Sequence, residues 1–548
     1  MMNPSNIFGT SCASQHKPGC CTPVKYIKIL FPFIWQLVFL FACNNRKKEL
    51  PALFEALSSG STGIDFINKL TPTPQFNMFK YMYYYNGAGV GVGDFNNDGL
   101  SDIFFSSNQG ENKLYLNEGG MKFKDVTKAA KIPQDGGWST GVSVVDINND
   151  GRLDIYICRV GNYETLKSKN QFLICKGVDV NGVPYYEDEA GKLGLDLSSF
   201  STQAAFFDQD LDGDLDLFLM THSLRRNGTF NERSSYINTF DTLGADYLFR
   251  NDEGIFTDIS ANAGINRSVI GYGLGLSVAD IDLDGYPDLY IGNDFHENDY
   301  LYINQKNGTF KDVLTEAIRH TSQFSMGTDV ADVTNDGFPE IISVDMMPED
   351  PYILKRSLGE DEYDLFHFKT AKGYEPQFAR NALQLNRRNG SFSDIAFYSN
   401  VFATDWSWSP LWTDFDNDGW KDLFISNGIS KRLNDMDYVN YITNERLLEK
   451  RYVNPADQND MSMLEKFPQI KLANKFYLNK GEAKFDDAAL LIRNNPKTYS
   501  NGAAYADFDN DGDIDIVVNN IDEPALIYKN LSNDGVAKKV FIELNLKG

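Results

Sequence analysis

Seven short acidic segments of the chain repeat one nine-residue pattern, D-x-[DNT]-x-D-G-x-x-[DE]. The segments begin at Asp94, Asp146, Asp208, Asp280, Asp332, Asp414 and Asp507. Each places oxygen-bearing side chains at positions 1, 3, 5 and 9, and a glycine at position 6 permits a sharp turn. Alternate side-chain oxygens plus a backbone carbonyl at position 7 suit a hard cation such as Ca²⁺. The pattern therefore predicts seven calcium-binding loops.

The predicted ligands occupy the same five positions in every loop, with position 7 contributing its backbone carbonyl. In chain order they are Asp94, Asn96, Asp98, Leu100 and Asp102; Asp146, Asn148, Asp150, Arg152 and Asp154; Asp208, Asp210, Asp212, Asp214 and Asp216; Asp280, Asp282, Asp284, Tyr286 and Asp288; Asp332, Thr334, Asp336, Phe338 and Glu340; Asp414, Asp416, Asp418, Trp420 and Asp422; and Asp507, Asp509, Asp511, Asp513 and Asp515. The fifth loop differs, because Thr334 offers a neutral oxygen and Glu340 is longer than the usual aspartate. Since affinity follows ligand charge and site rigidity, we expect this loop to bind Ca²⁺ most weakly.

The residues around each loop indicate strands rather than the helices of an EF-hand. An EF-hand requires a bidentate glutamate at position 12 on an exiting helix. Position 12 is instead Phe105, Ile157, Leu219, Ile291, Ser343, Ile425 or Val518. Short β-branched and aromatic runs such as residues 103–105 follow the loops, which is typical of strands. Five loops also have a glycine five residues before the first aspartate, at Gly89, Gly141, Gly275, Gly327 and Gly502, whereas the third and sixth loops have Gln203 and Ser409 there. The unit is strand, calcium loop, strand, and the EF-hand interpretation is excluded.

A second motif follows most loops and completes the repeat. The sequence L-Y-x-N at 114–117 leads to F-x-D-V at 123–126, and similar pairs occur at 248–259, 301–313, 383–395 and 476–487. Glycine-containing turns between the two halves are typical of hairpins. Each repeat therefore contains four strands, and seven such units predict an all-β fold, a seven-bladed β-propeller over residues 60–535. We expect the N-terminal segment 63–68 to supply the outer strand of the last blade, which would close the ring without an exposed edge.

The beginning of the chain has the features of a targeting segment, and the composition limits the partners. Lys25 and Lys28 precede an uncharged run, residues 29–42, that ends at Cys43 and is too short to span a membrane. The ending L-F-A-C resembles a lipobox, which predicts a membrane lipid anchor on Cys43; an ordinary signal peptide or an uncleaved anchor remains an alternative. Residues 44–59 would then form a linker. A formal net charge of −25 argues against a nucleic-acid partner.

Several phrases carry a resemblance to a known family, among them residues 84–94, 405–410, 427–429 and 345–350. They resemble FG-GAP/VCBS repeat proteins, whose calcium-loop propeller is similar to the integrin α-chain head. More narrowly, the chain resembles bacterial lipoproteins that end in an ASPIC/UnbV domain and are related to cartilage acidic protein. Residues 536–548 resemble the start of that domain, truncated here. The resemblance implies Ca²⁺ binding, export and attachment to the outer membrane of a gram-negative cell.

The long insertions 221–246, 345–380 and 426–475 all follow post-loop strands, so they are expected on the face opposite the calcium loops, with an amphipathic helix near Tyr438 as a lid. Variable loops on a rigid scaffold are where binding usually resides. We therefore expect a non-enzymatic binding or adhesion module that recognises an extracellular glycan or protein ligand. The alternative is a propeller enzyme acting on glycans, although no catalytic motif of the common hydrolase types occurs. Cys158 and Cys175 lie on neighbouring expected strands, either as a disulfide or as two buried thiols.

Overall fold

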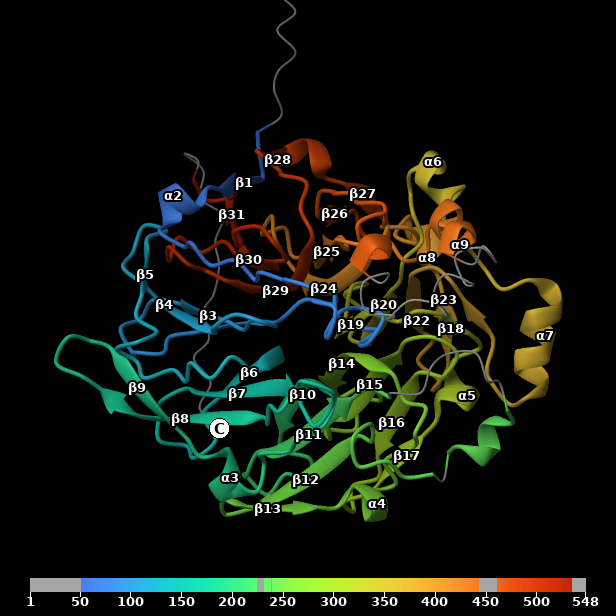
Figure 1. Ribbon diagram of the computed structural model, residues 1–548, viewed down its shortest axis with the longest axis horizontal. Helices are drawn as coiled ribbons and strands as arrows, with labels where there is room; N and C mark the ends of the chain where they lie inside the picture. Colours follow the sequence, from blue (N-terminus) through green and yellow to red (C-terminus); the bar gives the residue numbers. More distant parts are fainter. Residues whose placement is uncertain (1–50, 224–230, 238, 443–460, 535–548) are drawn as a thin grey trace, which may run out of the picture. The chain divides into compact units, whose positions relative to one another are not determined.

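The computed structural model describes residues 51–223, 231–237, 239–442 and 461–534. Within the unit that begins at Ala52, these residues form seven sheets arranged around a central axis (Figure 1). Six of the sheets have four strands each, and the seventh has five. The expected all-β, seven-bladed propeller is confirmed.

In blades one to six the four strands of a blade come from one stretch of the chain. Blade one contains β2 (Val90–Gly93), β3 (Asp102–Phe105), β4 (Lys113–Asn117) and β5 (Phe123–Asp125); blade two β6 (Trp138–Val145), β7 (Asp154–Val160), β8 (Gln171–Val178) and β9 (Pro184–Asp188); blade three β10 (Ser201–Phe207), β11 (Asp216–Thr221), β12 (Tyr247–Asp252) and β13 (Ile255–Asp258). Blade four contains β14 (Gly273–Ala279), β15 (Asp288–Asn293), β16 (Tyr300–Asn304) and β17 (Phe310–Asp312); blade five β19 (Gly327–Ala331), β20 (Glu340–Val344), β22 (Ala382–Asn386) and β23 (Phe392–Asp394); blade six β24 (Ser407–Thr413), β25 (Asp422–Asn427), β26 (Lys475–Asn479) and β27 (Phe485–Asp487). A separate two-stranded sheet pairs β18 (Thr321–Ser322) with β21 (Gln377–Phe378).

The second strand of every blade is buried along its whole length. In β3, for example, Ile103, Phe104 and Phe105 are all fully buried. Neighbouring strands cover its two edges and adjacent blades cover its two faces. A strand buried on both faces has no reason to alternate apolar and polar residues. This explains the continuous apolar runs after the loops.

Blade seven is completed by a strand from the other end of the chain. Its sheet has the order β28 (Ile492–Arg493), β1 (Phe54–Leu57), β31 (Leu526–Asn530), β30 (Asp515–Asn520) and β29 (Ser500–Ala506). β1 pairs antiparallel with β31, and it lies within the stretch 44–59 that we expected to be a linker. The expectation that residues 63–68 form this outer strand is wrong. That segment makes only isolated bridges, Ile67 to Pro524 and Asn68 to Ile521, while Phe66 stacks on Phe105 of blade one.

The glycines before the loops mark close contacts between the innermost strands. A Cβ atom added at Gly327 would lie 1.7 Å from the carbonyl oxygen of Trp408 in the next blade. At Gly141 it would lie 2.5 Å from the carbonyl of Thr202, and at Gly502 2.5 Å from that of Ala88. Such distances leave no room for a side chain. The glycines therefore allow neighbouring blades to approach each other around the axis.

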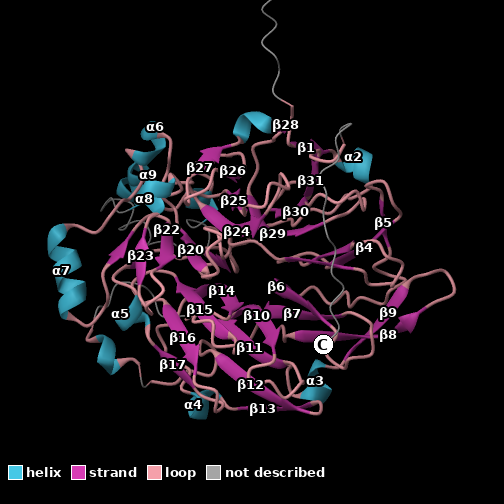
Figure 2. Ribbon diagram, turned by 180° about the vertical axis from the view of Figure 1, so that it is seen from behind, coloured by secondary structure: helices cyan, strands magenta, loops and turns pink. Residues whose placement is uncertain are grey.

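The described helices are short and lie mainly around the periphery of the ring (Figure 2). They include α2 (Ser59–Thr62), α3 (Ala190–Leu193), η1 (Arg233–Ser235), α4 (Ser260–Ala263), α5 (Leu314–Ala317), α6 (Pro351–Leu354), α7 (Tyr363–Ala371), α8 (Ala396–Ser399), α9 (Met436–Ile442) and η2 (Ala489–Leu491). Across the described ranges, none of the helices has the length and apolar character needed to cross a membrane. Cys158 in β7 and Cys175 in β8 are buried free thiols. Cys43 and the expected targeting segment, and residues 536–548, lie outside the described residues.

Candidate metal centres

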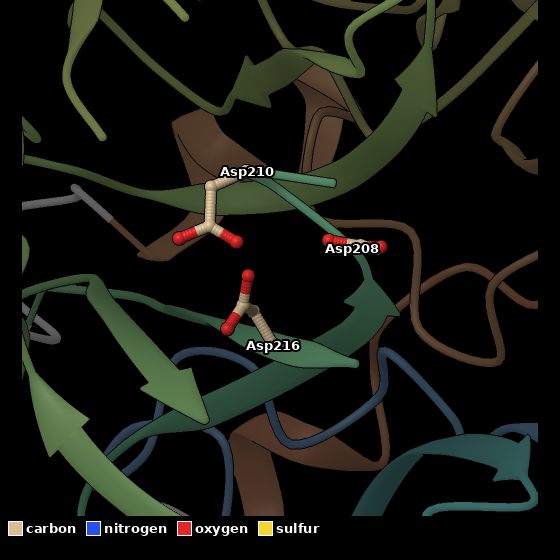
Figure 3. A group of neighbouring side chains, drawn as sticks. All are labelled: Asp208, Asp210 and Asp216. Atoms are coloured by element: carbon tan, nitrogen blue, oxygen red, sulfur yellow. The ribbon is translucent and has the colours of Figure 1, made fainter. Parts of the chain in front are cut away.

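Four of the predicted loops bring three carboxylates together. In the third loop, oxygen atoms of Asp208, Asp210 and Asp216 all lie within 4.8 Å of one another, and Figure 3 shows the three side chains converging. Equivalent groups, from positions 1, 3 and 9, occur in the fourth loop (Asp280, Asp282 and Asp288) and the sixth loop (Asp414, Asp416 and Asp422). In the seventh loop the group is formed by positions 1, 3 and 5, which are Asp507, Asp509 and Asp511. These four loops are the ones with aspartate at position 3. In the remaining loops position 3 is Asn96, Asn148 or Thr334, so a carboxylate is replaced by a neutral oxygen.

The backbone of each loop is wrapped around the carboxylate at position 1. In the third loop, Asp208 accepts hydrogen bonds from the backbone N–H of Asp212 at 3.1 Å and of Gly213 at 2.9 Å. The glycine N–H makes the same bond in all seven loops, at 2.7–2.9 Å. Gly213 has a φ of 97°, a conformation that favours glycine. The same turn geometry in all seven loops explains why D-G recurs at positions 5 and 6.

The carboxylate at position 9 is the first residue of the buried second strand in every blade. In the third loop, Asp216 accepts from the N–H of Gln209 at 3.0 Å and from the N–H of Asn251 at 2.7 Å. Its side chain is buried, and this burial raises its pKa to about 7. Position-9 carboxyls in the other loops have pKa values raised in the same direction by burial. Each carboxylate offers about four lone pairs, so two hydrogen bonds leave acceptor capacity for a cation.

The oxygens that face the loop centres fit a hard divalent cation. Oδ1 of Asp210 is buried without a hydrogen-bond partner, and so is Oδ1 of Asp509, although the other oxygen of Asp509 accepts from Lys529 Nζ at 2.6 Å. Burial, followed by the charges of Asp212 and Asp208, raises the pKa of Asp210. Buried, unpaired carboxylate oxygens are costly unless a cation or donor compensates them. An all-oxygen ligand set is the type that Ca²⁺ and Mg²⁺ prefer.

The fifth loop differs in structure as it does in sequence. Oγ1 of Thr334 and Oε1 of Glu340 are buried without hydrogen-bond partners. The guanidinium of Arg388, in the hairpin between β22 and β23, contacts the position-5 carboxylate, with Nε 3.2 Å from Oδ2 of Asp336. A positive group is therefore already present beside one predicted ligand. This arrangement reduces the electrostatic gain from a bound cation. Arg152, Lys306 and Lys529 make similar contacts with Asp150, Asp284 and Asp509 in the second, fourth and seventh loops, so the feature peculiar to the fifth loop is its pair of substituted ligands, Thr334 and Glu340.

The L-Y-x-N motif predicts a strand, and its asparagine has a second role that the motif did not predict. Asn117 is buried, and its side-chain amide donates to the carbonyl of Ser101 at 3.0 Å and to that of Phe508, in the seventh loop, at 2.8 Å. Its backbone N–H donates to Asp102 at 2.7 Å. The asparagines of four other blades reach the preceding blade's loop in the same way: Asn304 to Gln209, Asn386 to Ile281, Asn479 to Val333 and Asn530 to Phe415. The repeated asparagine at this position was the available signal.

One mouth of the central channel is filled by the chain itself. Residues 70–85 contribute Phe76, Tyr81, Tyr83 and Tyr84 to a buried aromatic cluster, and this part of the chain reaches the centre of the ring in Figure 1. The hydroxyl of Tyr81 lies 2.9 Å from Nε2 of His222, at the end of β11. The hydroxyl of Tyr83 donates to Asp294, after β15, at 3.0 Å. We call residues 70–85 the plug. These contacts place the plug at the ends of the second strands, which lie opposite the loops.

The predicted insertions contact one another beside the plug. The backbone N–H of Arg233, in the blade-three insertion, donates to Lys372 O of the blade-five insertion at 2.9 Å. The backbone N–H of Leu358 donates to the carbonyl oxygen of Asn434 at 2.7 Å, and this bond joins the insertions of blades five and six. The expected lid helix corresponds to α9 up to Ile442, and its continuation lies outside the described residues. A cavity of about 450 Å³ runs between the inner strands, lined by residues such as Gln203, Asp329 and Tyr505.

Comparison with known protein families agrees with this repeat geometry. A family model described as an FG-GAP-like repeat matches residues 94–157 and 280–343. Each stretch begins at the first aspartate of a loop and ends in the second strand of the following blade. The chain is a seven-bladed β-propeller that contains FG-GAP-like repeats.

Curated relatives of this FG-GAP propeller share parts of their length with it. Cartilage acidic protein 1 from Xenopus tropicalis is 25% identical over 250 residues, which is 46% of this chain and 34% of that protein. The proteins of the same name from Mus musculus and Homo sapiens are each 36% identical over 72 residues, or 13% of this chain and 11% of each relative. The chain thus spans about a third or less of the relatives that it matches.

Proposed function

We propose that this FG-GAP propeller is an extracytoplasmic binding or adhesion module that is stabilised by Ca²⁺ in its seven loops. The observation that carries the proposal is the convergence of three carboxylates in each of four loops, among them Asp208, Asp210 and Asp216, together with a buried oxygen of Asp210 that lacks a partner. The Ca²⁺ would be held by the side chains at positions 1, 3, 5 and 9 and the carbonyl at position 7. Its chemical contribution would be charge neutralisation. The fold and the similarity to cartilage acidic protein 1 support an exported binding protein rather than an intracellular one.

We place the ligand surface on the insertions opposite the calcium loops. The insertion of blade five exposes large apolar side chains: Tyr352 is 67% exposed, Tyr363 75% and Phe368 46%. Exposed aromatic side chains on a rigid scaffold provide contact area for glycans or proteins at low entropic cost. The plug already occupies the channel mouth on this side. An extracellular glycan or protein would therefore bind across the insertions and not inside the channel.

An array of glycans and matrix proteins, probed with the purified chain in Ca²⁺ and in EDTA, tests this function. We expect calcium-dependent binding that is lost in a Tyr352→Ser/Tyr363→Ser variant. Leu490→Ser is the matched control, since Leu490 is 93% exposed but lies in η2, outside the insertions. Binding that survives the double substitution would refute the proposed surface. Hydrolysis of a glycan on the array would instead favour the enzymatic alternative.

We also propose that the chain is anchored at the cell envelope through a lipid on Cys43. The support is the basic and apolar sequence before Cys43 and its lipobox-like ending. In a gram-negative host, the wild-type chain should incorporate labelled palmitate and fractionate with the outer membrane. Cys43→Ser should abolish labelling, and labelling that persists would refute the anchor.

A further inference from the structure

Position 4 of the calcium loops was not assigned a role by the motif, yet it connects the loops of neighbouring blades. The residue is asparagine in five loops and leucine in two, Leu211 and Leu283. In four of the five cases, the side-chain amide donates to the carbonyl of the position-6 glycine in the next loop around the ring. The pairs are Asn97 to Gly151 at 2.8 Å, Asn335 to Gly419 at 2.9 Å, Asn417 to Gly512 at 3.0 Å and Asn510 to Gly99 at 3.0 Å.

The bonds form a continuous series rather than a scattered set. They run from blade five through blades six and seven, cross from the last blade to the first, and end at blade two. Asn510 and Gly99 are separated by 411 residues, so this bond spans the two ends of the ring. Three of these boundaries, from blade five to blade one, also carry the buried asparagine bonds of Asn117, Asn479 and Asn530.

Backbone conformation alone does not account for the asparagines. Position 4 has a left-handed φ of 52–62° in all seven loops, which asparagine tolerates better than most residues. However, Leu211 and Leu283 adopt the same conformation, so the turn does not require an amide. The amide adds a directed contact to the glycine that follows the position-5 ligand of the next loop.

The boundary between blades two and three lacks both kinds of asparagine bridge among the described residues. Among the described residues, no hydrogen bond joins Asn149 to the third loop, and the amide of Asn251 donates to Leu215 of its own loop. The molecule therefore contains bridged and unbridged boundaries within one ring, which offers an internal comparison.

We propose that the position-4 asparagines are positioning residues that couple adjacent cation loops, so that occupancy of one loop strengthens binding in its bridged neighbour. The proposal rests on the calcium function proposed above. A cation orders the loop that holds it, and ordering fixes the glycine carbonyl that the neighbouring asparagine binds. The neighbouring loop then loses less conformational freedom when its own cation binds. Coupling should follow the bridges and be absent between blades two and three.

The test weakens one loop and follows the Ca²⁺ response of the loops on either side of it. Asp150→Asn weakens the second loop of the full chain, and hydrogen exchange of the first and third loops is followed as free Ca²⁺ is titrated. We expect the half-saturating Ca²⁺ of the first loop to rise roughly two- to tenfold, the range given by the net free energy of a typical hydrogen bond. The third loop should be unchanged. Adding Asn97→Gly, which keeps the left-handed turn but removes the amide, should abolish the shift in the first loop.

Asn149→Gly is the matched control, since it makes the same change at an unbridged boundary and should leave the first loop's response to Asp150→Asn intact. Equal shifts in the first and third loops, no shift in the first, or a shift that survives Asn97→Gly would each overturn the coupling while leaving calcium binding in place. Absence of calcium-dependent protection in every loop would refute the calcium assignment, and this proposal with it.

Discussion

The side-chain amide of Asn117 donates a 2.8 Å hydrogen bond to the backbone carbonyl of Phe508, which ties blade one to the cation loop of blade seven. Four other blades repeat this bond to the loop before them. Because the asparagine also binds its own loop, it fixes the relative position of two loops at once. The candidate cation loops and the joints between blades are therefore held by the same asparagines.

Replacing Asn117 should destabilise the ring at this joint. Asn117→Ala removes two buried donor contacts, to Ser101 and Phe508, and the acceptor for Gly119 N–H. We expect a loss of about 2–3 kcal/mol, since carbonyls are left without their buried partners. Denaturant unfolding in saturating Ca²⁺ measures it. Asn181→Ala, in the exposed β8–β9 hairpin, should change stability by under about 0.5 kcal/mol, and equal losses in both variants would contradict the assigned role.

The close glycine contacts around the axis predict that adding one methyl group at such a glycine strongly destabilises the fold. In Gly327→Ala the new Cβ would meet the Trp408 carbonyl oxygen at 1.7 Å, so the two inner strands must separate. We expect at least about 3 kcal/mol of destabilisation or failure to fold, as for overpacked cores. Gly359→Ala is the control, because no atom lies within 4 Å of its added Cβ. A Gly327→Ala protein with wild-type melting would show that the ring does not depend on this approach.

The fifth loop should have the lowest Ca²⁺ affinity. Thr334 is neutral, Glu340 is longer than aspartate, and Arg388 already contacts Asp336. Hydrogen exchange of each loop during a Ca²⁺ titration should show this loop filling last. Arg388→Ala should strengthen it by removing the competing charge, whereas the exposed Arg387, replaced in the same way, should have little effect. A fifth loop that fills first would show that ligand charge does not order the sites.

Calcium-free protein should show an inverted dependence of stability on pH. Burial raises the pKa of Asp102, Asp216 and Asp288 to about 7, above the ordinary value of 3.8. A raised carboxyl pKa means that the folded state binds protons more tightly than the unfolded chain. This contribution is fully present below pH 3.8 and is lost as pH rises through about 7. In EDTA the protein should therefore be more stable at pH 5.5 than at pH 7.5, by about 2 kcal/mol for each such carboxyl.

In Ca²⁺ the trend should disappear or reverse, because protons compete with the cation for the same oxygens. His222 acts in the opposite direction, since burial lowers its pKa to about 4, so His222→Gln should enlarge the gain at acid pH in EDTA. Melting temperatures at the two pH values, with and without Ca²⁺, decide the matter. Identical pH profiles in EDTA and in Ca²⁺ would contradict the role of these carboxyls.

The parts of the fold that could be predicted from the sequence are those encoded locally. Each loop carries its aspartates and glycine within nine residues, and the next residues form the buried strand, so the loop, strand and blade number follow from the repeat. β1 was missed because Phe54–Leu57 has neither a loop nor a motif beside it, and its place depends on pairing with β31, more than 450 residues away. The contacts of Gly327 with Trp408, and of Asn117 with Phe508, likewise join separate blades. A single sequence shows that such residues recur but not what they touch.

The calcium content of the purified chain tests the central claim most directly. After dialysis into buffer with low free Ca²⁺, atomic emission should find close to seven equivalents of Ca²⁺ per chain. As free Ca²⁺ is lowered further, the fifth loop should lose its Ca²⁺ first. EDTA should remove them and lower the melting temperature markedly, since each site contributes about 2.7 kcal/mol at a hundredfold excess of Ca²⁺ over its Kd. Two or fewer equivalents, together with an unchanged melting curve in EDTA, would show that hydrogen bonds alone hold the loops and that these carboxylate clusters are not calcium sites.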